Sequence, residues 1–596
     1  MEFEQKAEEK KMSMSKNIAR LAVTAGLTAA LSFGGVMAPV TMAFADGAAG
    51  STVTFNDPTY QETTTYKGIR IFTANVNGSS VTNIQWAGSG EQQTTIQNAV
   101  LEAIKTKEPG YSKTTAQDAA EWLKDHSKVS GDDSYVANDN VLNKIAKKLN
   151  ESNLTWEKTA QGSNKLTGLG TGYWLFLTNG VYKPADGSAV EQSTDAFTSP
   201  IFKLVNGTDS VNITPKKKIP TVEKKIVSDA SGVECDAADS HIGQDVTYNI
   251  YGTIADNYDS YASYFYKFSD QISRGLTLQP DSAKVYLYAS PTEAKADLNH
   301  KNNTGTDITT YFNRESSDAD LSDGSVTTTW TCNDLKTIPG VNITKDSCIV
   351  VSYTAQINNK AVVGKSNNGL GNYNTVTLYY SNNPMTTDYG QTVPDTVRDY
   401  TYGLKINKVD LGTERALNGA QFTIQVNKPD DPTLNGEFVK DDGTLSASEY
   451  VFTTKNDGSF TVTGLDAGKY TVKEKPLKGY DNISPFDFEI VPTMPTDGAK
   501  VEKLELRMNE SEKLIPGIND NSEGKVGDNR LESMADTTTN SDGTFNITVG
   551  NTKQVGLPLT GLNGVTFTWI AGGAVLCIGV AHLIRSRKQA EESEQE

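Results

Sequence analysis

Gly403-Leu404-Lys405-Ile406-Asn407-Lys408-Val409-Asp410 is the stretch that decides the fold of the last third of this chain. Apolar residues alternate in it with polar ones, which is the pattern of a half-buried β-strand. Successive side chains of a strand point to opposite faces, so Lys408 shares the apolar face of Leu404 and Ile406. The stretch therefore predicts a strand of a β-sandwich that carries a lysine into the core.

Two later strands place polar groups on the same kind of apolar face. Glu474 follows two apolar residues at a spacing of two in the run 470–474, and Asn551 does the same in the run 545–551. A lone buried charge is costly, and burial lowers the pKa of a lysine and raises that of a carboxyl group. A neutral amine is a nucleophile, and an acid beside an amide can move protons. The three residues therefore predict an isopeptide bond from Lys408 to Asn551, with Glu474 as the proton carrier.

The same triple recurs in the preceding part of the chain. Lys224 lies between two apolar residues of a strand, and Asp270 and Asn382 share the parity of apolar neighbours in two other strands. Asn383 and Asn374 lie nearby; alternation favours Asn382 over Asn383, and the identity of the asparagine that closes this bond stays open. The alternative interpretation is that these lysines reach water at strand ends and pair with a carboxylate.

Three units are predicted between the two ends of the chain. Residues 46–215 contain early and late strands around a helical middle, where apolar residues recur at spacings of three and four. Residues 216–400 and 401–556 are rich in strand and turn signals. We predict a mainly β protein of tandem immunoglobulin-like β-sandwiches, the first with a helical insertion. Lys67 of the first unit has no acid in the matching place, so no bond is predicted there.

The charge and the cysteine content of the chain limit the classes of function that it can have. The chain has 73 Asp and Glu against 55 Lys and Arg, which argues against a nucleic-acid partner. Its scattered histidines and cysteines form no metal-binding or catalytic motif, so we predict no metal, no cofactor and no enzyme activity. Cys577 lies in the C-terminal apolar segment, which is expected to be removed. Of the other three cysteines, Cys332 and Cys348 flank a loop between two strand-like runs, which favours them as a disulfide and leaves Cys235 over.

Residues 1–45 have the pattern of an export signal. Basic residues precede an uncharged apolar run, and Ala43-Phe44-Ala45 supplies the small-x-small pattern that signal peptidase cleaves. We expect cleavage after Ala45; the alternative is a retained membrane anchor. Translation from Met12 or Met14 also stays open, because the residues before them are acidic.

Residues 557–596 carry a second sorting pattern. Leu557-Pro558-Leu559-Thr560-Gly561 precedes an apolar segment, 565–584, that is long enough to span a bilayer. A cluster of Arg and Lys follows and is expected to hold that end in the cytoplasm. The arrangement resembles the LPXTG cell-wall sorting signal. The resemblance implies that a sortase cleaves between Thr560 and Gly561 and joins the threonine carboxyl to an amine.

Motifs in the two later units resemble domains of Gram-positive pilins. The third unit looks like a collagen-adhesin B-type domain in the runs 403–410, 417–422 and 468–480. The second is similar to the fimbrial isopeptide-forming D2 domain in the runs 220–225, 268–270 and 380–384. The resemblance implies that the cross-linking residues are Lys408, Glu474 and Asn551 in the third unit and Lys224, Asp270 and Asn382 in the second.

The end of the first unit resembles the pilin motif. It reads Val211-Asn212-Ile213-Thr214-Pro215-Lys216, with Thr214 where the family often has tyrosine. The resemblance implies that Lys216 attacks the sortase-bound threonine of the next subunit; Lys217 and Lys218 stay alternatives.

The function that these resemblances imply is the shaft subunit of a covalent pilus that is secreted and anchored in a Gram-positive cell wall. Its expected partners are a sortase, identical subunits and peptidoglycan, with minor pilins and host ligands as further candidates. The alternatives are a wall-anchored adhesin displayed singly, which binds a host protein or glycan, and an ancillary pilin at the base or tip.

Overall fold

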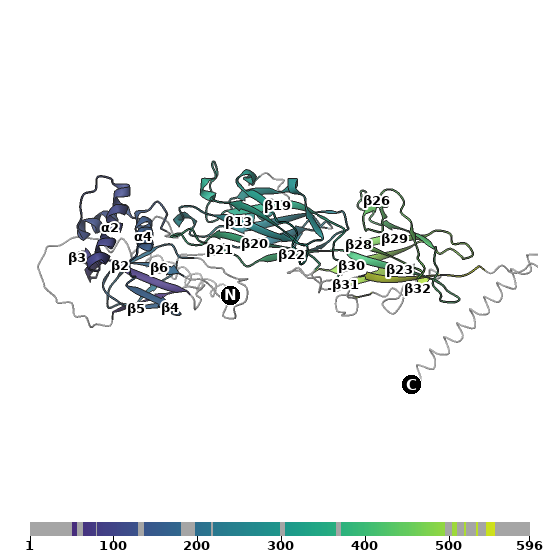
Figure 1. Ribbon diagram of the computed structural model, residues 1–596, viewed down its shortest axis with the longest axis horizontal. Coiled ribbons are helices and arrows are strands. Elements are labelled where there is room, and N and C mark those ends of the chain that lie inside the picture. Colours follow the sequence, from purple (N-terminus) through teal and green to yellow (C-terminus); the bar gives the residue numbers. More distant parts are fainter. Residues whose placement is uncertain are drawn as a thin grey trace, which may run out of the picture.

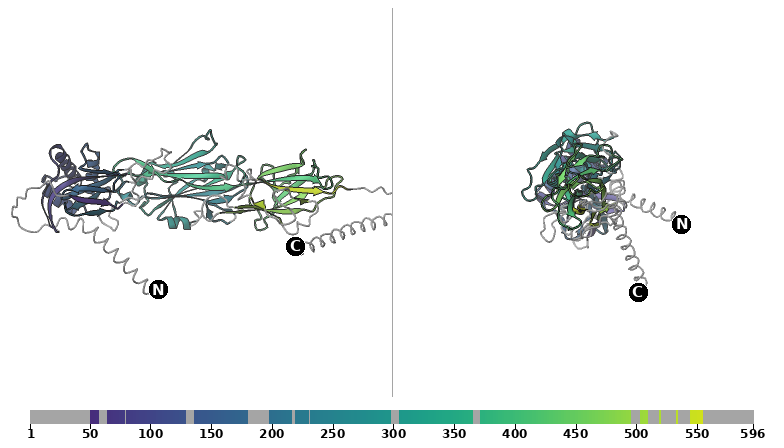
Figure 2. Two further views of the ribbon diagram at one scale, coloured as in Figure 1. Left: turned by 90° about the horizontal axis from the view of Figure 1, so that it is seen from below. Right: turned by 90° about the vertical axis from the view of Figure 1, so that its right-hand side faces the viewer.

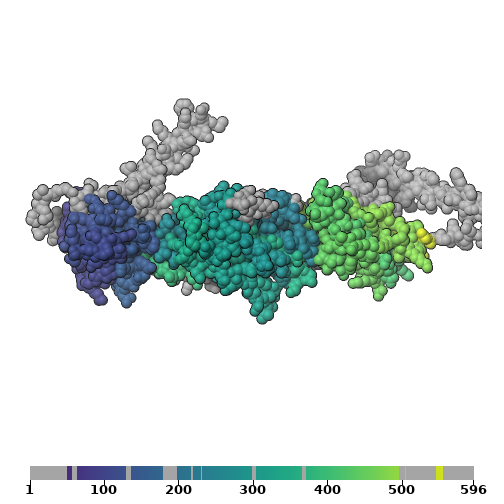
Figure 3. Space-filling model, turned by 90° about the horizontal axis from the view of Figure 1, so that it is seen from above, coloured from purple at the N-terminus to yellow at the C-terminus, as the bar shows by residue number. Residues whose placement is uncertain are grey.

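Three units follow one another along a single long axis in the computed structural model of this chain (Figures 1 and 2). The first, second and third units form consecutive parts of a rod, with no doubling back between them (Figure 3). The structure describes residues 50–554 except for the segments 57–63, 79, 129–135, 180–196, 216–218, 230, 298–303, 365–370, 495–502, 509–517, 520–531 and 534–543.

The first unit is a β-domain with an inserted group of helices. Its sheets have the strand orders β5-β1-β8 and β3-β2-β6-β7, with β4 paired to β2. Thr115 and Asn140 cap two of the helices by accepting backbone N–H groups, which fixes where those helices begin. The elements are β1 (Ser51–Phe55), β2 (Thr65–Asn77), β3 (Ser80–Trp86), α2 (Gly90–Lys107), α3 (Ala116–His126), α4 (Val141–Glu151), β4 (Lys158–Gln161), β5 (Lys165–Leu169), β6 (Gly172–Asn179), β7 (Ile201–Val205) and β8 (Val211–Ile213).

The second unit is a sandwich of two sheets around one apolar core. Their strand orders are β10-β9-β12-β19-β15-β16, with β14 on β19, and β11-β22-β20-β13-β18-β17, with β21 on β20. The strands are β9 (Val222–Val227), β10 (Glu234–Cys235), β11 (Ala237–Asp239), β12 (Asp245–Thr253), β13 (Tyr266–Ile272), β14 (Leu276–Leu278), β15 (Lys284–Tyr288), β16 (Thr306–Asp307), β17 (Asn313–Ser316), β18 (Val326–Cys332), β19 (Cys348–Ile357), β20 (Asn372–Ser381), β21 (Tyr389–Gln391) and β22 (Asp395–Tyr400). Its helical turns are η2 (Tyr258–Ser260), η3 (Pro280–Ser282), α5 (Pro291–Ala296), η5 (Thr309–Tyr311) and η6 (Leu335–Thr337).

The third unit is a second sandwich, with strand orders β28-β23-β34-β32 and β26-β25-β24-β29-β30-β31-β33 and with β27 on β24. The expected mainly β architecture, with a helical insertion in the first unit, is therefore confirmed. The strands are β23 (Tyr402–Asp410), β24 (Gln421–Val426), β25 (Phe438–Val439), β26 (Leu445–Ser446), β27 (Phe452–Thr453), β28 (Ser459–Leu465), β29 (Gly468–Glu474), β30 (Phe486–Thr493), β31 (Lys503–Met508), β32 (Ile518–Asn519), β33 (Glu532–Ser533) and β34 (Thr544–Asn551).

The predicted disulfide is wrong, because the two cysteines belong to different sheets and both are free. Cys332 ends β18 and lies in the core between the sheets. Cys348 begins β19 and packs in a separate cluster with Tyr251 and Tyr288, while its neighbour Ile349 faces the main core. The loop between the cysteines crosses from one sheet to the other, which proximity in sequence does not reveal.

The second and third units meet in a close contact. The backbone N–H of Ile242 donates to the carbonyl of Gly464 at 3.0 Å. A Cβ atom on Gly464 would lie 2.3 Å from Cδ1 of Ile242, and its φ of +88° also favours glycine. The hydroxyl of Tyr402 donates to Asp239 across the same junction at 3.2 Å. The junction is therefore a packed interface rather than a free linker.

This junction makes stability depend on pH. Burial and the nearby charge of Asp229 raise the pKa of Asp239 to about 6, and burial also raises the pKa of Asp466. Between about pH 4 and 6 the folded state keeps a proton that the unfolded chain has released, so the free energy of unfolding falls as pH rises. We expect a lower unfolding temperature at pH 8 than at pH 5. Calorimetry of Asp239→Asn should show a smaller difference; an equal one would contradict the assignment to Asp239.

Candidate functional site

The first and last strands of the third unit lie side by side and bring a lysine and an asparagine together. β23 pairs in parallel with β34, so that Lys408 lies opposite Val549 and Asp410 lies opposite Asn551. Glu474 ends β29 in the facing sheet. Alternation along these strands turns all three polar side chains toward the core, as the sequence predicts.

The three side chains form one buried cluster. The ammonium nitrogen Nζ of Lys408 lies 3.7 Å from Oε1 of Glu474, and both side chains are 0% exposed. Nζ also donates to the carbonyl of Val549 at 3.2 Å. Nδ2 of Asn551 donates to the two oxygens of Glu474 at 3.0 and 2.9 Å. One carboxylate therefore contacts both the amine and the amide.

Burial prepares this lysine for reaction. It lowers the pKa of Lys408 to about 8, with Glu474 acting in the opposite direction. Oδ1 of Asn551 is buried and has no hydrogen-bond partner among the described residues. An amine in this position can attack the carboxamide carbon of Asn551, while Glu474 takes a lysine proton and passes it to the leaving nitrogen that it already contacts.

The second unit holds a related cluster between its two sheets. Nζ of Lys224, on β9, donates to Oδ1 of Asp270, on β13, at 2.7 Å, and neither side chain is exposed. Nζ also donates to the hydroxyl of Tyr353, on β19, at 3.0 Å. The hydroxyl in turn donates to Oδ2 of Asp270. Burial lowers the pKa of Lys224 and raises that of Asp270, so both shifts favour the neutral amine and the neutral acid.

Asn374, rather than Asn382, lies at this cluster. Nδ2 of Asn374 donates to the Tyr353 hydroxyl at 2.6 Å, and the side chain is buried. In β20 it lies opposite Ile272, while Val376 lies opposite Asp270.

The structure places Asn382 beyond the end of β20. Six residues of strand, roughly 20 Å, separate it from Val376, the partner of Asp270. The backbone carbonyl of Asn382 accepts a hydrogen bond from the backbone N–H of Phe197, which belongs to the first unit. The preference for Asn382 is therefore wrong. Alternation identified the correct face, which Asn374 shares, but not the position along the strand.

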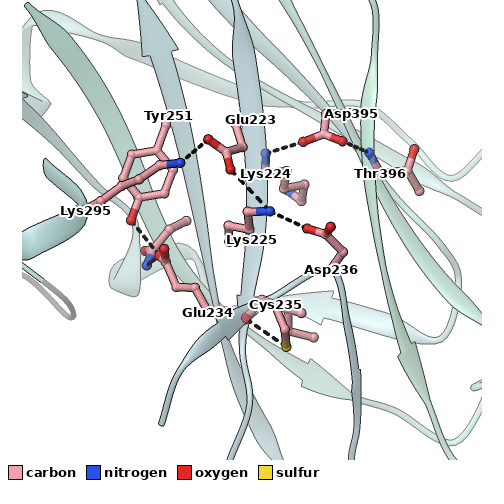
Figure 4. A network of polar contacts seen from close by, with 12 residues as sticks. Glu223, Lys224, Lys225, Glu234, Cys235, Asp236, Tyr251, Lys295, Asp395 and Thr396 are labelled. Atoms are coloured by element: carbon pink, nitrogen blue, oxygen red, sulfur yellow. Dashed lines mark hydrogen bonds and ion pairs between the residues drawn. The ribbon is translucent and has the colours of Figure 1, made fainter. Parts of the chain in front are cut away.

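The neighbouring lysine shows how a surface pair differs from this cluster. Lys225 faces away from the core and pairs with Asp236 at 2.6 Å and with Glu223 at 3.2 Å (Figure 4). The backbone N–H of Lys224 donates to Asp395 at 2.7 Å, which ties β9 to β22 of the other sheet (Figure 4). The strand is thereby held in place while only Lys224 enters the core.

A third lysine contacts an asparagine in the first unit, and no acid among the residues that the structure describes lies beside it. Nζ of Lys67 donates to Oδ1 of Asn150 at 2.7 Å and lies 4.4 Å from the ring centre of Trp156. Burial alone lowers the pKa of Lys67 to about 8. No carboxyl group among the described residues contributes to that pKa, so within them the pair lacks the proton carrier that both other clusters contain.

Several predicted sites lie outside the described residues. These are the signal-cleavage residues Ala43 and Ala45, the acceptor Lys216 with its neighbours Lys217 and Lys218, and the sorting residues Leu557, Pro558, Thr560 and Gly561. The apolar segment 565–584 also lies outside them; within the described part of the chain, no helix is both long and apolar enough to cross a membrane. Nor do histidine, cysteine and acidic side chains gather there in a group able to hold a metal ion.

Comparison with known proteins gives a family match for the unit that holds Lys408 and Glu474. Residues 403–504 match the family model of the SpaA prealbumin-like fold domain. A curated relative, the trypsin-resistant surface T6 protein of Streptococcus pyogenes serotype M6, is 32% identical over 144 residues. That match spans 22% of this chain and 23% of the relative, so it covers about a quarter of the relative's length.

Two solved structures extend over more of the chain. The T6 backbone pilin of Streptococcus pyogenes serotype M6 has 16% identity and a TM-score of 0.46, covering 85% of this chain and 99% of its own. The major pilin SpaD from Corynebacterium diphtheriae has 15% identity and a TM-score of 0.40, covering 85% of this chain and 98% of its own.

Proposed function

We propose that this chain is the shaft subunit of a sortase-assembled covalent pilus on a Gram-positive cell surface, with a structural rather than an enzymatic role. The observation that carries the proposal is the pair of buried lysine–acid–asparagine clusters in consecutive units of a rod. Each cluster would form one Lys–Asn isopeptide bond with loss of ammonia, Lys224 to Asn374 and Lys408 to Asn551.

The order of the units along the chain supports this role. A bond from Lys216 of one subunit to Thr560 of another would send tension through residues 216–560 of every subunit. These residues comprise the second and third units, which hold the complete clusters. The first unit would lie beside the path of force, and among the described residues no acid lies beside its Lys67–Asn150 pair. Covalent reinforcement would thus be confined to the units that carry load.

The ends of the chain complete the proposed assembly. The export signal would direct the chain out of the cell, and the sortase would cleave between Thr560 and Gly561. Head-to-tail joining at an angle that does not close a ring gives a filament. The last subunit would be joined to peptidoglycan instead of another pilin. Minor pilins and host ligands are further proposed partners of the assembled fibre.

The experiment is a denaturing gel of boiled cell-wall extracts, blotted for this protein. Wild-type cells should give a ladder of high-mass bands, which Lys216→Ala should collapse to the monomer. Lys217→Ala and Lys218→Ala are the matched controls and should keep the ladder. A ladder that survives Lys216→Ala would move the joint elsewhere. A single monomeric band in wild-type cells would favour the alternative, a wall-anchored adhesin displayed singly.

A further inference from the structure

The cluster in the second unit contains a fourth polar group, the hydroxyl of Tyr353, which has no counterpart among the described residues of the third-unit cluster. The hydroxyl of Tyr353 receives hydrogen bonds from Nζ of Lys224 at 3.0 Å and from Nδ2 of Asn374 at 2.6 Å, and it donates to Asp270. A phenolic hydroxyl has one proton to donate and lone pairs to accept, so these contacts occupy it fully. The side chain is 1% exposed, which excludes bulk water as a competitor.

The third unit shows why the hydroxyl is needed. There Glu474 contacts Asn551 directly through both oxygens and also faces Lys408. Asp270 is one methylene shorter than a glutamate, and its two oxygens are taken by Lys224 and Tyr353. The polar contact of the Asn374 amide nitrogen is with the hydroxyl and not with the acid.

We propose that Tyr353 is a catalytic residue of isopeptide-bond formation in the second unit and relays a proton from Lys224 to the departing nitrogen of Asn374. This inference rests on the proposed cross-link and deepens it. The hydroxyl touches both reacting nitrogens, which distinguishes it from the other aromatic residues of the core.

The groups present account for every proton and bond in the reaction of Lys224 with Asn374. Lys224 gives its first proton to Asp270 along the 2.7 Å contact, and the neutral amine attacks the carboxamide carbon of Asn374. Tyr353 then takes a second proton from Nζ while passing its own proton to Nδ2. The carbon–Nδ2 bond breaks and ammonia leaves. The third lysine proton stays on the isopeptide nitrogen, Tyr353 is restored, and Asp270 remains protonated.

The test is Tyr353→Phe in the full exported chain, followed by intact mass and peptide mapping. The ring that stacks on Tyr248 and Trp330 is kept and only the hydroxyl is lost. We expect the variant to fold, to form the Lys408–Asn551 bond normally, and to lack the Lys224–Asn374 bond or form it at least tenfold more slowly. The third unit serves as an internal control in the same molecule.

Tyr248→Phe is the matched control, because this neighbouring core hydroxyl has no hydrogen-bond partner in the part of the chain that the structure describes. It should form both bonds at the wild-type rate. Full bond formation in Tyr353→Phe at that rate, or equal loss in Tyr248→Phe, would overturn the relay. If Tyr353→Phe does not fold, 3-fluorotyrosine at position 353 keeps the ring and changes the acidity of the hydroxyl; an unchanged rate and pH profile of ammonia loss would then overturn it. Absence of the bond in wild-type protein would instead refute the proposed cross-link itself.

Discussion

Replacing Glu474 with glutamine is expected to abolish the cross-link of the third unit and to lower its unfolding temperature by about 10 °C or more. Glutamine keeps the size of the side chain and one of the two oxygens that accept from Nδ2 of Asn551, but it cannot take a proton from Lys408. The lost bond would close a loop of roughly 140 residues, and constraining a loop of that length stabilises by about 5 kcal/mol. At about 2–4 °C per kcal/mol for a unit of this size, the expected fall is 10–20 °C.

Two other variants serve as comparisons. Lys408→Ala also removes the bond, and it leaves Glu474 buried without its cation, just as Glu474→Gln leaves Lys408 buried without its acid. We therefore expect Lys408→Ala to melt well below the wild type, as Glu474→Gln does. Lys405→Ala changes the other face of the same strand and should melt like the wild type.

Mass spectrometry and calorimetry check these variants together. The exported wild-type chain should be lighter than its sequence by two molecules of ammonia, and Glu474→Gln lighter than its own sequence by one. A deficit of three would assign a bond to Lys67 and Asn150 as well. Unchanged melting in both Glu474→Gln and Lys408→Ala would refute the cross-link of the third unit.

Alternation along strands predicted the third cluster because its strands are regular. Lys408, Glu474 and Asn551 each continue an unbroken apolar row, and the parallel pairing of β23 with β34 then brings them together. The helical insertion could also be predicted, since apolar residues recur in that part of the chain at spacings of three and four. Local patterns determine these features, so the sequence alone suffices for them.

The two wrong predictions concern residues whose positions depend on pairing between strands that are distant in the sequence. Asn374 and Asn382 have the same parity in the sequence, but Asn374 lies in β20 and Asn382 lies just beyond its end, and only the pairing of Val376 with Asp270 selects between them. This register results from contacts across the whole sheet, which no local pattern encodes. The disulfide between Cys332 and Cys348 failed for a similar reason, because the chain changes sheets between them.

Tyr353 was missed because an aromatic residue in a core-facing row is ordinarily a packing residue. Its neighbours Val351 and Ala355 lie in the same core, so the alternation around it indicates nothing unusual. The signal that could have found it is chemical: a hydroxyl in a core that must also hold Lys224 and Asp270. Buried polar groups need partners, so a tyrosine in that row is a candidate partner for both.

Asn374→Ala is expected to remove the cross-link of the second unit, whereas Asn382→Ala should leave it intact. Asn374 supplies the carbon that Lys224 would attack, and its amide lies 2.6 Å from the hydroxyl that also contacts the lysine. The lost loop is roughly 150 residues long, so the expected destabilisation is again about 5 kcal/mol, or 10–20 °C in unfolding temperature. Asn382→Ala should change that temperature by only a few degrees.

Peptide mapping of the wild-type protein gives the most direct measurement. A branched peptide should join Lys224 to Asn374, and a branch to Asn382 would restore the assignment made from strand parity. Closure at Asn374 also leaves residues 375–400 outside the covalent loop. This segment includes β22, which is held by non-covalent contacts. Examples are its pairing with β11 and the hydrogen bond that Asp395 accepts from the backbone N–H of Lys224. Under tension, we therefore expect residues 375–400 to detach and extend first. The cross-link between Lys224 and Asn374 would prevent the rest of the second unit from extending.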